Sequence, residues 1–102
     1  MNDLTGFQRD ILYVIAGLAD ATALEIKEEL QEAYEIEITQ DRLYPSLHGL
    51  IERGFVEEGT LNDQAQSYAL TEQGQDEIVT QRKWENKYLT KERLTNRPPT
   101  EL

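Results

Sequence analysis

The side chains best suited to recognise another molecule gather between residues 39 and 53. Gln40 and Arg42 lie at the start of this segment. Arginine can make two parallel hydrogen bonds to the edge of guanine, and glutamine can do the same with adenine. The hydroxyls of Thr39, Tyr44 and Ser46 are of the kind that contacts phosphate oxygens. These residue types at this spacing indicate readout of a nucleic acid.

A helix must position these groups, and its apolar residues decide which side faces out. Steps of about 100° per residue bring the apolar residues Leu43, Leu47, Leu50 and Ile51 onto one side. Arg42, Pro45, Ser46 and Gly49 then fall on the opposite or flanking surface, whereas Gln40 turns towards the leucine side. A small residue such as Gly49 allows close approach to a DNA backbone. The alternative to a DNA-reading face is a helix face that contacts only solvent. Asp41 favours this alternative, because a carboxylate repels phosphate.

The sequence gives little support for disulfides, metal binding or catalysis. The chain has no cysteine, which excludes disulfides, thiolate zinc sites and cysteine nucleophiles. His48 is the single histidine and has no clustered ligands, so it is either a pH-sensitive DNA contact or a helix residue without a special role. The many glutamates are expected to be solvated. With no nucleophile–base pair and no glycine-rich phosphate loop, we predict no enzyme, no cofactor and no metal.

Three helices are expected first, over residues 5–18, 22–33 and 39–53. Thr5 with Gln8 and Thr22 with Glu25 have capping-box spacing. Gly54 is expected to end the third helix. The inner stripe of the first helix is Phe7, Ile11, Val14, Ile15 and Leu18, and that of the second is Ala23, Ile26, Leu30 and Ala33.

A hairpin and a fourth helix follow. Residues 55–59 and 66–70 are strand candidates, and residues 60–65 between them contain Asn62-Asp63, which favours a turn. Thr71 is expected to cap a last helix. The fold class is therefore mainly α with a two-stranded β-wing, a winged helix-turn-helix. The predicted parts are a winged-helix domain (4–70), a dimerisation helix (71–91) and a flexible tail (92–102).

The terminal helices suggest an interface between two copies of the chain. Trp84 and Tyr88 are four residues apart and share one side of the last helix. Tyr13 points away from the main stripe of the first helix and is a third candidate. The alternative for Trp84 is a core position. Because soluble domains rarely leave large apolar patches uncovered, we predict a homodimer through these residues.

Three stretches resemble the PadR family of transcriptional regulators. The first two are Arg42-Leu43-Tyr44-Pro45-Ser46-Leu47 and Leu50-Ile51-Glu52-Arg53-Gly54-Phe55-Val56; the third is Tyr68-Ala69-Leu70-Thr71 followed by Gly74. The opening helix, residues 7–18, is similar to that of short, acidic PadR-like regulators of halophilic archaea. The resemblance covers about residues 4–90. It implies a homodimer on double-stranded DNA, with the third helix in the major groove, the wings near the minor groove, and repression as the usual outcome.

Two features depart from the family pattern. Residues 61–66, at the wing tip, carry no lysine or arginine where the family pattern leads us to expect phosphate contacts. The C-terminal helix is short beside those of PadR members that bind drugs or phenolic acids. The sequence therefore leaves a small-molecule effector open.

Charge is uneven along the chain, whose net charge is −10. Residues 1–81 hold seventeen acidic and four basic side chains, a net charge of −13, whereas residues 82–102 hold six basic and three acidic ones, a net charge of +3. This pattern suits either an acidic interaction module or a protein of a highly saline cytoplasm, and we favour the second. The basic C-terminal residues either contact phosphate, complement the helix dipole or pair with a partner's acids.

The main rival function is that of a winged-helix adaptor that binds proteins and not DNA, which the unbasic wing favours. No apolar run is long enough to span a bilayer, and no signal segment is recognised. We therefore expect no membrane partner and a cytoplasmic location. The operator sequence and the target genes cannot be read from the sequence.

Overall fold

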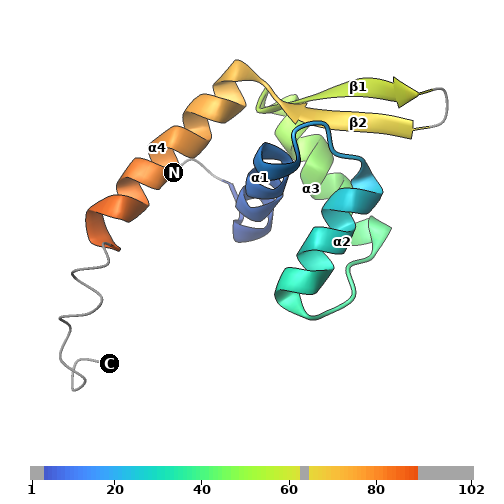
Figure 1. Ribbon diagram of the computed structural model, residues 1–102, viewed down its shortest axis with the longest axis horizontal. Coiled ribbons are helices and arrows are strands. Elements are labelled where there is room, and N and C mark those ends of the chain that lie inside the picture. Colours follow the sequence, from blue (N-terminus) through green and yellow to red (C-terminus); the bar gives the residue numbers. More distant parts are fainter. Residues whose placement is uncertain (1–3, 63–64, 90–102) are drawn as a thin grey trace.

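The computed structural model describes residues 4–62 and 65–89. Its elements are, in chain order, α1 (Gly6–Leu18), α2 (Ala23–Tyr34), α3 (Gln40–Glu52), β1 (Val56–Asn62), β2 (Ala65–Leu70) and α4 (Glu72–Tyr88). This order confirms the expected winged helix-turn-helix (Figure 1). The last helix is described as far as Tyr88, with Leu89 as its C-cap, and residues 90–91 of the predicted helix lie outside the described residues. The predicted tail, 92–102, and the tip residues 63–64 lie outside the described residues.

Each helix begins at a threonine that acts as N-cap. The hydroxyls of Thr5, Thr22, Thr39 and Thr71 accept hydrogen bonds from the backbone N–H three residues later, at Gln8, Glu25, Arg42 and Gly74. Such a bond satisfies one of the N–H groups that the first turn leaves without a partner. Both predicted capping boxes are present. Gly54 has φ of 80° directly after the C-cap Arg53, as its predicted role in ending α3 requires.

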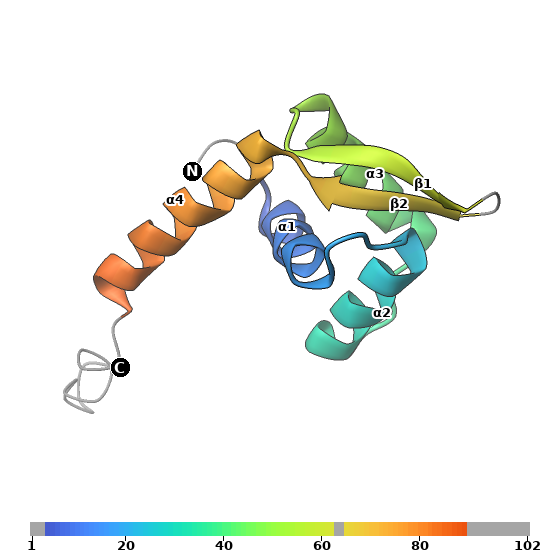
Figure 2. The same cartoon turned by 45° about the horizontal axis from the view of Figure 1, so that its top comes forward.

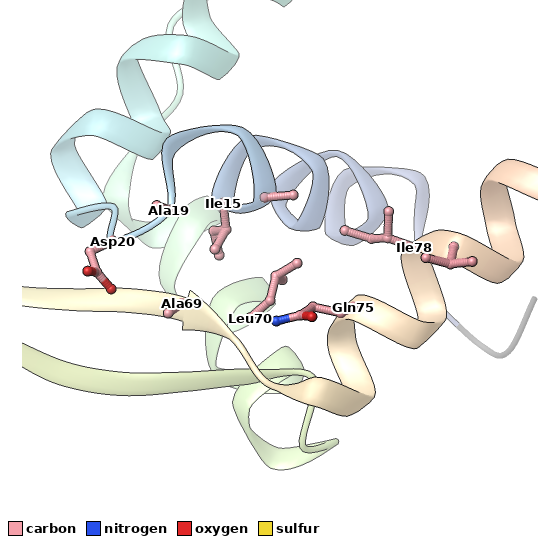
Figure 3. Close-up of a pocket in the computed structure, with 9 residues that line it drawn as sticks. Ile15, Ala19, Asp20, Ala69, Leu70, Gln75 and Ile78 are labelled. Carbon is pink, nitrogen blue, oxygen red and sulfur yellow. The ribbon is translucent and has the colours of Figure 1, made fainter.

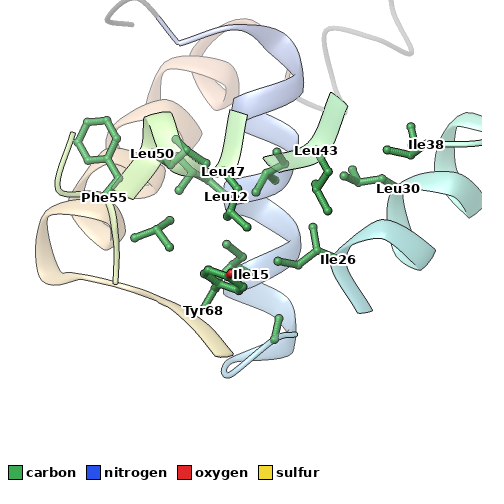
Figure 4. Close-up of a cluster of buried hydrophobic side chains, with 13 residues drawn as sticks. Leu12, Ile15, Ile26, Leu30, Ile38, Leu43, Leu47, Leu50, Phe55 and Tyr68 are labelled. Carbon is green, nitrogen blue, oxygen red and sulfur yellow. The ribbon is translucent and has the colours of Figure 1, made fainter. Parts of the chain in front are cut away.

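The core is a single cluster in which α1 lies against α2, α3, β2 and α4 (Figure 4). Its fully buried large side chains are Ile11, Leu12, Ile15, Ile26, Leu30, Ile38, Leu43, Leu47, Leu50 and Val56. The predicted inner stripes are wrong at two positions, because the side chains of Leu18 and Ala33 are exposed. Both lie in the last turn of their helix, where the helix runs past the side chains that it packs on.

The wing is an antiparallel hairpin, longer than predicted. Strand β1 starts one residue later than expected and continues to Asn62, so the expected six-residue tip is mostly strand. Tyr68 of β2 also pairs with Ala21, between α1 and α2, through N–H to O=C bonds of 3.1 and 2.8 Å. This bridge ties the wing to the helical body.

Helix α4 and the wing project from the body in opposite directions in both views (Figures 1 and 2). The junction of α4 with the body is tight. A Cβ added to Gly74 would overlap the carbonyl group of Phe55. The hydroxyl of Thr71 donates to the carbonyl oxygen of Gly54 at 2.5 Å. The start of α4 is therefore fixed against the end of α3.

Replacing Gly74 by alanine should lower the free energy of unfolding by about 1–3 kcal/mol, because the methyl group must push backbone apart. Urea denaturation followed by circular dichroism measures the change. Gly17→Ala is the matched control: nothing lies within 4 Å of its Cβ position, so it should stabilise α1 by about 0.5–1 kcal/mol. Equal stability of the two variants would contradict the tight junction.

Candidate nucleic-acid interface

Helix α3 buries its leucines and exposes the opposite side. Leu43, Leu47 and Leu50 are at most 1% exposed. The side chains that point away from them are exposed: Asp41, Arg42, Pro45, His48 and Glu52. These five residues form the outward face of α3. Because the other described elements leave this face uncovered, it is accessible to a large partner.

The residues at the start of α3 have separate roles. The hydroxyl oxygen of Thr39 accepts from the backbone N–H of Arg42 at 3.3 Å, so this oxygen is engaged as a cap. Gln40 is exposed although the helical wheel turns it towards the leucines, because the first residue of the helix lies beyond the end of the core. Both side chains therefore lie at the N-terminal rim of the outward face. Their contacts with DNA stay a prediction.

Arg42 rests on an aromatic ring. Its guanidinium carbon lies 4.4 Å from the centre of the Phe7 ring in α1, which is a cation–π distance. Phe7 is half-buried and lies 6.2 Å, centre to centre, from the ring of Tyr34 in α2. The tyrosine hydroxyl donates to Asp10. Helices α1 and α2 thus both contribute to the surroundings of Arg42.

Ser46 and Gly49 lie on the flank of α3 beside α1 and are only partly open to solvent. The side-chain amide of Gln8 donates to the carbonyl oxygen of Ser46 at 3.3 Å. A Cβ at Gly49 would lie 2.7 Å from the same amide nitrogen. Both residues are half-buried. The absent side chain of Gly49 therefore makes room for α1, which the helical wheel of α3 alone could not reveal.

An aromatic pair on α3 contains His48, which the sequence left open as either a DNA contact or a residue without a special role. The rings of Tyr44 and His48 lie 6.1 Å apart, and His48 is exposed beside Pro45. Their spacing of four residues was a signal in the sequence that could have found this pair. Tyr44 is half-buried and packs against the core.

Burial shapes the titration of the tyrosines around this helix. Burial, and then the hydrogen bond to Asp10, raise the pKa of Tyr34 to about 12. Burial, and then the negative charge of Glu58, raise the pKa of Tyr68 to about 12. Both phenols are therefore protonated and neutral at physiological pH. They act as hydrogen-bond donors within the fold and not as bases.

The surface around α3 is acidic. Asp41 and Glu52 lie on the outward face itself, and Glu57 and Glu58 are exposed on β1. Phosphate contact normally relies on clustered lysine and arginine. At an ionic strength of 1 M, charges more than about 3 Å apart are screened from each other. The acidic surface therefore opposes DNA strongly in dilute salt and weakly in concentrated salt.

The C-terminal half of α4 carries uncovered aromatic side chains. Trp84 and Tyr88 are 60% and 46% exposed, with ring centres 5.3 Å apart. The alternative of a core position for Trp84 is therefore wrong within the single chain. Tyr13, the third predicted interface residue, is half-buried and donates to Glu85 of α4 at 3.3 Å. Its hydroxyl thus joins α1 to α4 of the same chain.

A pocket of about 530 Å³ lies where α1, β2 and α4 meet (Figure 3). Most of its lining is apolar: Ile15, Ala16, Ala19, Ala69, Leu70, Ile78 and Val79, with Asp20 and Gln75 as the polar members. Asp20 is the single ionisable side chain of this lining, so the pocket offers no acid–base pair. In the part of the chain that the structure describes, no group of three or more potential ligands is placed to hold a metal ion, and no helix is long and apolar enough to cross a membrane.

Several solved structures resemble this fold. RosR of H. salinarum is 40% identical, and the match covers 87% of this chain and 81% of that one with a TM-score of 0.78. A cysteine-to-serine mutant of MarR from E. coli is 25% identical over 97% of this chain and 70% of its own, with a TM-score of 0.77. F93 from STIV, a winged-helix DNA-binding protein, is 22% identical over 80% and 89%, with a TM-score of 0.67, and supports the fold alone.

The sequence comparisons point the same way. No curated protein matches the chain by sequence. The profile of the transcriptional regulator PadR-like family matches residues 11–80, which include α2, α3, the wing and most of α1. Together with the likeness to RosR, this match makes the protein a winged-helix transcriptional regulator and not an enzyme. The chain belongs to the PadR-like family of transcriptional regulators.

Proposed function

We propose that this protein is a sequence-specific repressor that binds double-stranded DNA as a homodimer, with α3 in the major groove. The observation that carries the proposal is the outward face of α3. Its leucines anchor the helix, and Arg42 and Pro45 remain exposed on the other side. An α-helix fits the major groove, where each base pair presents a distinct pattern of donors and acceptors.

Roles follow from the position of each side chain. Arg42 reads guanine, and Gln40 reads a neighbouring base from the rim of the outward face. Thr39, Tyr44 and Ser46 contact phosphate or sugar, and Pro45, which is exposed, allows the backbone of α3 to approach the groove closely. His48 lies on the same face as Pro45 and joins the groove contacts. Repression is the outcome that the family resemblance implies, since a bound dimer blocks access to a promoter.

Concentrated salt is the setting in which this acidic chain binds best. A net charge of −13 over residues 1–81 repels phosphate in dilute solution. In molar salt both this repulsion and the usual gain from counterion release are small. Hydrogen bonds to bases, shape fit and burial then supply the affinity. This reasoning supports a saline cytoplasm as the working environment.

The homodimer forms through α4. Its C-terminal half exposes Trp84 and Tyr88, and the C-cap Leu89 that follows is also exposed. Helix α4 extends away from its own body (Figure 2). Acidic side chains, Glu72, Asp76 and Glu77, lie in the first half of α4, whereas the second half holds the basic ones, Arg82, Lys83 and Lys87, and one acidic residue, Glu85. Two copies related by a two-fold axis and paired antiparallel would bring opposite charges together and cover the aromatic rings.

The variant Arg42→Ala tests the reading of DNA. It should weaken binding to the preferred duplex by about 1–3 kcal/mol, because a hydrogen-bonded pair with guanine is lost. The duplex is first selected from a random pool by the wild-type protein in 2 M KCl, and affinities are then measured by fluorescence anisotropy. Lys27→Ala, which removes one positive charge from α2 and lies outside both α4 and the outward face of α3, is the control and should bind within twofold of wild type.

Two results would count against this function. If the wild-type protein selects no duplex in molar salt, the adaptor alternative replaces DNA binding. If a duplex is selected but Arg42→Ala binds it as tightly as wild type, Arg42 does not read a base. A selected motif with two-fold symmetry, its halves about one helical turn apart, is the positive result that supports a dimer on DNA.

The double variant Trp84→Ala/Tyr88→Ala tests the dimer. Sedimentation velocity should give twice the chain mass of 11.8 kDa for wild type and the single mass for the variant. Leu24→Ala is the matched control, because Leu24 on α2 is 62% exposed and lies outside α4. A wild-type protein that is monomeric at millimolar concentration in 2 M KCl would contradict the proposal.

A further inference from the structure

The ring of Phe7, in the first turn of α1, lies under the guanidinium of Arg42 at the start of α3. Two further contacts fix the ring in place. Phe7 packs against the core and lies 6.2 Å from the ring of Tyr34, at an angle of 47°. Tyr34 in turn donates to Asp10, one turn after Phe7. We call these three residues, Phe7, Asp10 and Tyr34, the arginine seat.

Stacking on a ring leaves an arginine able to read DNA. The attraction acts through the flat face of the guanidinium, whereas its five N–H donors point outward in the plane. Within residues 4–62 and 65–89, the guanidinium of Arg42 makes no hydrogen bond or ion pair. The donors that would meet a guanine are therefore unoccupied, while the orientation of the group is already restricted.

The seat also engages the carboxylate of Asp10, which bonds to the same tyrosine that feels the charge of Arg42. Asp10 accepts from the Tyr34 hydroxyl, and its other oxygen lies 4.0 Å from the Nε of Arg9. Arg42 is close enough to Tyr34 for its charge to oppose the rise in the pKa of that phenol. An Asp10 without the phenol would be drawn to Arg42, and such an ion pair would occupy the donors needed for a base.

We infer that Phe7 is a positioning residue for DNA reading: it holds the Arg42 guanidinium in one orientation, with its donors directed outward, before DNA arrives. This inference rests on the proposed function. A long side chain loses rotamer freedom when it is fixed on a base, and a ring that fixes it beforehand reduces that loss. Phe7 itself touches no base.

A double-mutant cycle tests the coupling between the two residues. The duplex is the one selected by wild-type protein from a random pool in 2 M KCl. Phe7→Leu should weaken binding about two- to fivefold, the range expected for an exposed cation–π contact. In the Arg42→Ala background the same substitution should cause no further loss. Phe7→Tyr keeps an aromatic face and should restore wild-type affinity.

A second set of measurements separates positioning from folding. In the protein without DNA, the δ-protons of Arg42 should show an upfield ring-current shift by NMR, which Phe7→Leu abolishes and Phe7→Tyr retains. Tyr34→Phe, which releases Asp10, should also weaken binding in the Arg42 background and not in the Arg42→Ala background. Urea denaturation of every variant identifies losses that come from unfolding.

Each outcome decides between clear alternatives. Equal losses from Phe7→Leu in both backgrounds, or the absence of the ring-current shift, overturn the seat while leaving DNA reading by Arg42 intact. If no duplex is selected, or if Arg42→Ala binds normally, the proposed reading of DNA fails and the positioning role fails with it. Coupled losses together with the shift support the inference.

Discussion

The burial of one leucine stripe determines which side of α3 meets a partner. Leu43, Leu47 and Leu50 are packed in the core between α1 and the wing, and each fully buried leucine contributes about 1.5–3 kcal/mol. This energy fixes the rotation of α3 about its axis. A rotation of one residue would bury a polar side chain and expose a leucine. The direction of the outward face and the position of Arg42 at its edge therefore both depend on this packing.

The same stripe explains what the sequence could predict. The spacing of apolar residues and the capping residues predicted the order of the elements and the threonine N-caps. The same spacing predicted that Arg42 and Pro45 are exposed, because the exposed side of a helix depends on residues within that helix. The packing of Ser46 and Gly49 against α1 depends on residues some forty positions away, and no pattern within α3 encodes it. The bridge between Ala21 and Tyr68 was not predicted for the same reason, because a single pair of residues produces no repeating pattern in the sequence.

The acidic composition and the DNA-binding fold are compatible only if little of the affinity comes from net charge. A basic protein gains affinity by releasing counterions, and this gain disappears as salt rises. This chain keeps one arginine at the edge of α3, supported by an aromatic ring, among exposed carboxylates such as Asp41 and Glu52. Such an arrangement favours contacts whose strength depends on geometry, because hydrogen bonds and stacking survive screening better than long-range attraction does.

Helix α1 connects the two ends of the molecule on which the proposed function depends. Its first turn holds Phe7 and Gln8 against α3, and its middle holds Tyr13 against Glu85 of α4. A helix of thirteen residues spans about 20 Å and is stiff over that length. The position of α4 relative to the body therefore also fixes its position relative to Arg42. In the proposed dimer paired through α4, the spacing between the two copies of α3 would follow from contacts along this one helix. The packing of α1 would then govern both the distance between the two half-sites and the orientation of Arg42.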